Sequence, residues 1–191
     1  MESESTDREW RALSEEILLG MKEWRRQHPK ATLREIEEAV SERLSRLGAQ
    51  MIQDAAQTST AADWKAHGEA EAPHCEHCGE VLVSRGKHPR HLQANGGAAV
   101  TIERRYGTCP RCGVGLFPLD EELGLLAGSL TPHQHESLAR LCVYMPFARA
   151  CQMLREMTGV QVSEATARRQ TYVSGEAYEA VQTAQAPIHF K

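Results

Sequence analysis

Two matching cysteine pairs constrain this 191-residue chain more than any other feature of its sequence. The segments Cys75–Glu80 (CEHCGE) and Cys109–Val114 (CPRCGV) share the pattern Cys-x-x-Cys-Gly. The two intervening residues let both sulfurs of one turn point at the same ion, and the glycine permits a backbone conformation that other residues resist. Structural zinc sites are tetrahedral and take four such thiolates. The spacing therefore predicts one structural zinc ion per chain, held by Cys75, Cys78, Cys109 and Cys112.

Other chemistries of paired cysteines stay open at this point. A redox dithiol usually has a single Cys-x-x-Cys in a βαβ context. Structural disulfides belong to oxidising compartments, and the acidic first residues, MESESTDREW, are not a secretory signal. Cys142 and Cys151 fall on apolar helical faces and are expected to be small core residues. Mixed Cys/His ligation is a further alternative, with candidates His74, His77, His88 and His91.

Composition favours several small modules over one large core, because hydrophobic residues make up 41% and aromatic residues only 5%. No run approaches the roughly 20 apolar residues needed to span a bilayer. Together with the absence of a secretory signal, this predicts a cytoplasmic protein. The net charge of −4 excludes a strongly basic surface over the whole chain, although residues 73–118 carry six basic and three acidic side chains.

Residues 1–57 have the pattern of a helical hairpin. Apolar side chains recur at helical spacing in each half of this segment. Capping boxes, Thr6 with Glu9 and Thr32 with Glu35, are expected to begin the two helices. The apolar stripe predicts packing within this chain or against a second copy, so a homo-oligomer through the N-terminal helices is one expectation.

Residues 58–73 lack periodicity and are expected to form a linker, which Trp64 anchors to a neighbouring unit. Residues 74–118 are expected to form a zinc ribbon, with β-prone segments at 81–84 and 99–106 and a turn at 94–97. This unit carries six basic side chains, which form either a solvated face or a surface that contacts DNA phosphates. They are Arg85, Lys87, Arg90, Arg104, Arg105 and Arg111.

Residues 119–191 are expected to be helical, with a short helix at 121–126 capped by Asp120 and another beginning at Thr131 and Pro132. The pattern at 147–185 predicts a helix-turn-helix, whose second helix would contact DNA bases with side chains near its start. An ordinary pair of packed helices is the alternative. The DNA-contacting residues of the first interpretation are Ser163, Thr166, Arg168, Arg169 and Gln170.

This chain resembles the N-terminal region of ISKra-type insertion-sequence transposases in several segments and in their order. Besides the two cysteine pairs, these are HPKATLREIEEAVSERLSRLGAQMI, RRYGTCPRCGVGLFPLDEELGL, LTPHQHESLARLC and PFARACQMLREMTGVQVSEATARR. The resemblance covers about residues 28–182, and the second cysteine pair followed by GLFPLDEELGL is its most specific part. Gly107 departs from the family, in which a second aromatic residue tends to follow Tyr106.

The resemblance implies binding of double-stranded DNA at transposon ends, and strand transfer by a metal-dependent RNase H-like domain that follows the helix-turn-helix. Asp120, Glu121 and Glu122 are adjacent in sequence and are not expected to be a catalytic triad. Because the chain stops at Lys191, we expect DNA recognition in transposition and DNA recombination, in association with the nucleoid, without strand-transfer chemistry of its own. A stand-alone zinc-dependent transcription regulator and a cytosolic dithiol oxidoreductase are the alternatives.

Overall fold

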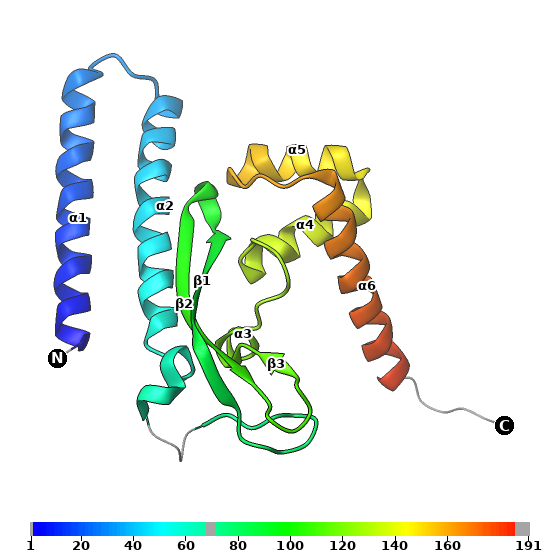
Figure 1. Ribbon diagram of the computed structural model, residues 1–191. Coiled ribbons are helices and arrows are strands. Elements are labelled where there is room, and N and C mark those ends of the chain that lie inside the picture. Colours follow the sequence, from blue (N-terminus) through cyan, green and yellow to red (C-terminus); the bar gives the residue numbers. More distant parts are fainter. Residues whose placement is uncertain (1, 68–71, 186–191) are drawn as a thin grey trace.

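A computed structural model describes residues 2–67 and 72–185 and shows a mainly helical protein with a small three-stranded antiparallel sheet (Figure 1). The helical hairpin formed by α1 and α2 lies on one side of the β1–β2 ribbon, and α4, α5 and α6 lie on the other (Figure 1). The elements are, in order, α1 (Glu2–Gln27), α2 (Leu33–Gln57), a 3-10 helix (Thr60–His67), β1 (Val83–Gln93), a second 3-10 turn (Asn95–Gly97), β2 (Ala99–Thr108), β3 (Gly115–Leu116), α3 (Pro118–Glu122), α4 (Pro132–Tyr144), α5 (Phe147–Thr158) and α6 (Glu164–Gln185).

The two N-terminal helices begin differently. The prediction that α1 begins at Thr6 is wrong, because α1 begins at Glu2 and Thr6 lies inside it. Acidic residues are favourable at a helix N-terminus, where they interact with the helix dipole, so the segment before Thr6 is compatible with helix. The second capping box is confirmed, since Thr32 accepts the backbone N–H of Glu35 and the Glu35 carboxylate accepts the backbone N–H of Thr32 at 2.6 Å.

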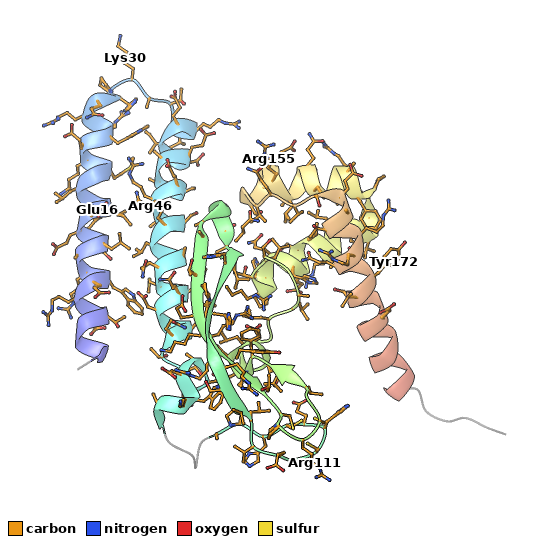
Figure 2. The ribbon with its side chains drawn as sticks, viewed as in Figure 1. Glu16, Lys30, Arg46, Arg111, Arg155 and Tyr172 are labelled. Carbon is orange, nitrogen blue, oxygen red and sulfur yellow. The ribbon has the colours of Figure 1, made fainter. Side chains whose placement is uncertain are left out.

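The contact between α1 and α2 is polar as well as apolar. The Trp10 indole N–H donates to the Asp54 carboxylate over 2.8 Å. Farther along the hairpin, Arg46 and Glu16 face each other from the two helices with a separation of 3.7 Å (Figure 2). The outer face of α1 leaves Leu18 exposed.

The β1–β2 ribbon pairs antiparallel from Val83 opposite Thr108 to Gln93 opposite Ala99, with an irregularity between Ser84 and Lys87. Only Val83 and Ser84 of the strand expected at 81–84 belong to β1, which extends to Gln93, while Val81 forms an isolated bridge with His74. Val100 and Ile102 alternate inward from β2 and are buried in a core shared with alanines of α2. This core joins the N-terminal hairpin to the ribbon.

Part of the segment expected to be a linker is ordered against the sheet. Trp64, in the 3-10 helix at Thr60–His67, is only 5% exposed and packs with Leu82 and the cysteines. A Cβ atom on Gly107 would lie 3.3 Å from the Trp64 ring and 3.1 Å from Leu82. The absence of a side chain at Gly107 thus lets the indole lie directly on β2. Residues 68–71 of the expected linker lie outside the described residues.

The C-terminal helices share one core. Leu138 of α4, Leu154 of α5 and Ala167 of α6 are fully buried together with Val160, from the turn between α5 and α6. The prediction that Asp120 caps a helix at 121–126 is wrong, because α3 begins at Pro118 and ends at Glu122. Proline is well suited to the first turn of a helix, since it has no N–H to leave unpaired.

Candidate metal centre and nucleic-acid interface

The two cysteine turns, called here knuckle 1 (Cys75–Glu80) and knuckle 2 (Cys109–Val114), have the same backbone geometry. The N–H of Gly79 donates to the carbonyl of Cys75 at 2.8 Å, and the N–H of Cys75 donates to that of Glu80 at 2.8 Å. Knuckle 2 repeats both bonds at 3.0 and 2.8 Å. Gly79 and Gly113 have φ angles of 73° and 74°, which side-chain-bearing residues rarely adopt. A repeated local sequence therefore gives a repeated local fold.

The sheet brings the two knuckles together. The Sγ atoms of Cys75 and Cys112 are 3.5 Å apart, and Cys78 lies 3.4 Å from Cys109 and 3.8 Å from Cys112. All four sulfurs lie within 4.8 Å of one another. A tetrahedral ion with metal–sulfur bonds of about 2.3 Å requires sulfur–sulfur distances of about 3.8 Å. The four cysteines could therefore hold a metal ion, and within the described residues this is the one such cluster of cysteine, histidine or acidic groups.

Backbone N–H groups of the knuckles favour the thiolate form of the cysteines, whereas a neighbouring cysteine sulfur can disfavour it. The backbone N–H of Cys112 donates to the sulfur of Cys109, and this hydrogen bond, together with that from the backbone N–H of Arg111, lowers the pKa of the Cys109 thiol to about 6. At Cys78 the backbone N–H of Glu80 also favours the thiolate, but hydrogen bonding to the Cys109 sulfur, burial and the other thiols raise the pKa to about 12. Four thiolates at these distances are stable together only around a cation, which deprotonates the ligands it binds.

The ribbon's basic side chains are mostly paired within the molecule. Asp63 lies 2.6 Å from both Arg105 and Lys87, and these hydrogen bonds, that to Arg105 first, lower the pKa of Asp63 to about 2. Asp63 belongs to the 3-10 helix next to Trp64, so the same segment packs against the cysteine cluster and pairs with one cation of β1 and one of β2.

A second aspartate binds two further arginines within the protein, so they are not part of the candidate DNA interface. Asp120 of α3 binds Arg90, at 2.8 Å, and Arg104. The guanidinium of Arg90 also donates to the carbonyl of Gly128, and that of Arg104 lies 3.7 Å above the Phe117 ring. Both arginine side chains are nearly buried, at 10% and 14% exposed. Arg90 and Arg104 therefore connect the ribbon to α3 and are not placed to contact DNA.

Three of the six basic residues remain exposed, and one of them, Lys87, is paired with Asp63. Arg85 is exposed and donates to the hydroxyl of Thr108 at 2.8 Å. Arg111 is exposed on knuckle 2, at the end of the ribbon far from α5 (Figure 2). The phosphate-contacting surface expected from sequence is thus reduced to a few exposed cations.

The first turns of α6 present a mixed cationic and aromatic face. Ser163 accepts the backbone N–H of Thr166 at 3.2 Å, which confirms Ser163 as the cap of this helix. Arg168 and Arg169 are exposed, and the guanidinium of Arg168 lies 5.5 Å from the centre of the Phe147 ring. Tyr172 continues this face one turn later and points away from the core (Figure 2).

Gln170 lies on the opposite side of α6 from this face. Its side chain is 5% exposed, and its amide donates to the carbonyl of Ala127 at 3.3 Å. The prediction that Gln170 contacts bases does not fit this position, because α6 turns that residue toward the segment before α4. Gln170 packs the helix in place while its neighbours Arg168 and Arg169 remain free to contact a ligand.

Several residues that shape these sites have no sequence signal as site residues. Asp63, Trp64 and Asp120 act across more than 15 positions of sequence, and a lone aspartate or tryptophan does not reveal its partner. Tyr172 could have been found from its spacing, because it follows Arg168 by one helical turn. Arg155, exposed on α5, is a further cation of the same three-helix unit (Figure 2).

A search of protein-family models, of curated proteins and of solved structures found no match to this chain. Within the residues that the structure describes, no helix is long and apolar enough to cross a membrane.

Proposed function

We propose that this chain binds double-stranded DNA through α6, that a zinc ion held by the four cysteines orders its ribbon, and that it serves as the DNA-binding part of a transposase. The observation that carries the proposal is the two-sided character of α6. One side buries Ala167 and Gln170, while the other exposes Arg168, Arg169 and Tyr172 directly after a capped N-terminus. A recognition helix has this arrangement, since its early side chains enter the major groove while its inner face packs on two supporting helices.

Arginine is the residue best suited to this role. Its guanidinium can donate two parallel hydrogen bonds to guanine, and one such pair contributes about 1–3 kcal/mol of discrimination between bases. The Phe147 ring beneath Arg168 limits the conformations of that side chain before DNA is bound. Thr166, in the first turn of α6, is half-buried, and its hydroxyl accepts a hydrogen bond from that of the cap Ser163. The arginines are therefore the principal hydrogen-bond donors to DNA in this proposal.

Zinc is the metal that the donor set favours. Four thiolates in a tetrahedral arrangement suit zinc, and such a site leaves no open position at which water could be activated. The zinc ion in this proposal therefore has a structural role, ordering the two knuckles and the Trp64 packing around them.

The experiment is selection of duplexes from a random pool by the zinc-loaded protein at low ionic strength, followed by affinity measurements on the enriched sequence. We expect one enriched sequence, and Arg168→Ala should weaken binding to it by about 5- to 150-fold. Arg34→Ala is the matched control, because Arg34 is exposed on α2, where it pairs with Glu38. Equal affinity of the wild type and Arg168→Ala for the selected duplex would refute α6 as the recognition helix.

The target distinguishes a transposase from a transcription regulator. Binding to the terminal sequences of the genetic element that encodes the chain supports the transposase proposal. Specific binding to a promoter and not to those ends would instead support the regulator.

A further inference from the structure

Gln93, the last residue of β1, connects three parts of the chain. Its backbone N–H donates to the carbonyl of Ser129 at 2.7 Å, and its carbonyl accepts the N–H of Thr131 at 3.2 Å. Its side-chain amide forms a reciprocal pair with the backbone of Gln161, donating to the carbonyl and accepting the N–H, both at 3.1 Å. One residue thus holds the segment before α4 with its backbone and the turn between α5 and α6 with its side chain.

Glycines bring the same two segments into close contact. The turn that ends the β1–β2 ribbon contains Gly96 and Gly97, and the turn after α5 contains Gly159. A Cβ atom on Gly97 would lie 2.7 Å from the carbonyl oxygen of Gly159, and one on Gly159 would lie 2.8 Å from the carbonyl carbon of Gly96. The two backbones therefore touch without intervening side chains, directly beside the Gln93–Gln161 pair.

The other side of this turn is also held. A Cβ atom on Gly96 would lie 2.2 Å from the hydroxyl oxygen of Ser45 on α2. The end of the ribbon is therefore enclosed between α2 and the turn leading to α6, at the place where the three units converge (Figure 1).

The junction formed by the Gln93–Gln161 pair and the glycine contacts lies next to the start of α6, the proposed DNA-binding helix. Gln161 lies two residues before Ser163, the cap at which α6 begins. Fixing the backbone of Gln161 to β1 therefore fixes the first turn of α6, with Arg168 and Arg169, relative to the ribbon and its exposed Arg85. Without the pair, the connection between α5 and α6 would be free to shift against the ribbon.

We propose that Gln93 is a positioning residue that sets the spacing between two DNA contacts, one made by α6 and one by the exposed Arg85 of the ribbon. This inference rests on the proposed function: the protein would bind a duplex in two segments at one fixed separation. The side chain at 161 does not take part in the pair, because Gln93 bonds only to the backbone there.

The first measurement needs no DNA. In Gln93→Met, which keeps the length of the side chain and removes both hydrogen bonds, the amide of Gln161 should exchange with solvent at least about tenfold faster than in the wild type, measured by NMR. Gln152→Ala, which removes an exposed glutamine bonded to Glu156 on α5, should leave that rate unchanged. Unchanged exchange at Gln161 in Gln93→Met would overturn the role of Gln93.

The second measurement uses the selected duplex, in which footprinting identifies the two segments that the protein covers, with one to five base pairs inserted between them. The wild type and Gln152→Ala should lose at least about tenfold in affinity on insertion, whereas Gln93→Met should bind the parent duplex about tenfold more weakly and discriminate less than about threefold among spacings. A wild type that tolerates every insertion overturns the spacing inference and leaves DNA binding intact. A wild type that selects no duplex overturns the proposed function and the spacing together, while the exchange rate still shows whether the junction exists.

Discussion

Replacing Cys109 with serine should abolish stable metal binding and unfold both knuckles. Cys109 is 2% exposed, and its sulfur lies 3.4 Å from that of Cys78, inside the cluster rather than at its edge. A serine hydroxyl stays protonated near neutral pH and cannot replace a thiolate as a zinc ligand. The loss is large because structural zinc binding contributes roughly 10–16 kcal/mol in small peptides, comparable to the whole stability of an ordinary domain.

The packing around the knuckles cannot compensate for this loss. Apart from the cysteines, the buried side chains of that cluster are Trp64, Ala72 and Leu82. Large apolar side chains contribute about 1.5–3 kcal/mol each when buried, well below the contribution of the metal. We therefore expect the knuckles and the Trp64 contact to become disordered, while the separate core of α4, α5 and α6 stays folded.

The assay combines zinc content after exhaustive dialysis with two-dimensional NMR of the same samples. The wild type should retain one zinc ion per chain, and Cys109→Ser less than about a tenth of that amount. The amide signals of Gly79 and Gly113 should collapse toward unfolded positions in the variant. Cys142→Ser is the matched control, since Cys142 lies outside the cluster on α4 and its loss should leave the zinc content unchanged.

Two results would refute this reasoning. Retention of the metal and of the knuckle signals by Cys109→Ser would show that the four sulfurs are not the ligand set. A wild type that contains no metal and cycles between thiol and disulfide would instead establish the dithiol alternative.

Three smaller perturbations test the surrounding structure by calorimetry or denaturant unfolding. Asp63→Asn should lower the free energy of unfolding by about 1 kcal/mol at neutral pH, a value reduced for the partial exposure of the ion pair. Because the folded pKa of Asp63, near 2, lies below the ordinary 3.8, the difference from wild type should persist down to about pH 4 and vanish as the pH falls toward 2. An unchanged difference at pH 2 would contradict the ion pair. Leu154→Ala should cost about 2–5 kcal/mol because Leu154 is fully buried, against less than about 0.5 kcal/mol for Met157→Ala, which is 70% exposed on the same helix. Thr32→Ala should cost about 1 kcal/mol by removing the cap of α2, and a neutral result would indicate that tertiary packing alone fixes the start of that helix.

The sequence predicted those features whose determinants are close together along the chain. The matched knuckles follow from six-residue motifs, and the caps at Thr32 and Ser163 follow from the residues three positions later. The failure at Thr6 has the same local origin, because a capping box permits a helix to begin but does not prevent a compatible segment before it from joining the helix.

Features that depend on distant residues were not predictable in this way. Asp63 reaches Arg105 across 42 positions, and the pair between Gln93 and Gln161 spans 68. Neither aspartate nor glutamine has a periodic pattern that identifies its partner, so only the folded chain reveals which polar groups meet. Burial of Gln170 likewise depends on the segment before α4, which the pattern of α6 does not contain.

The difference between local and distant determinants also explains why the basic surface that the sequence predicts on residues 74–118 is largely absent from the folded protein. Counting charges between residues 73 and 118 gives an excess of basic side chains, yet that count omits Asp63 and Asp120, which lie outside the segment in sequence and against it in space. Each aspartate binds two of those cations, so the local excess is largely neutralised within the molecule. A phosphate would have to compete with these partners, whereas Arg168 and Arg169 are exposed on α6. If DNA is bound, mutation of Arg168 should therefore reduce affinity far more than mutation of Arg90, whose removal should instead appear as lower stability.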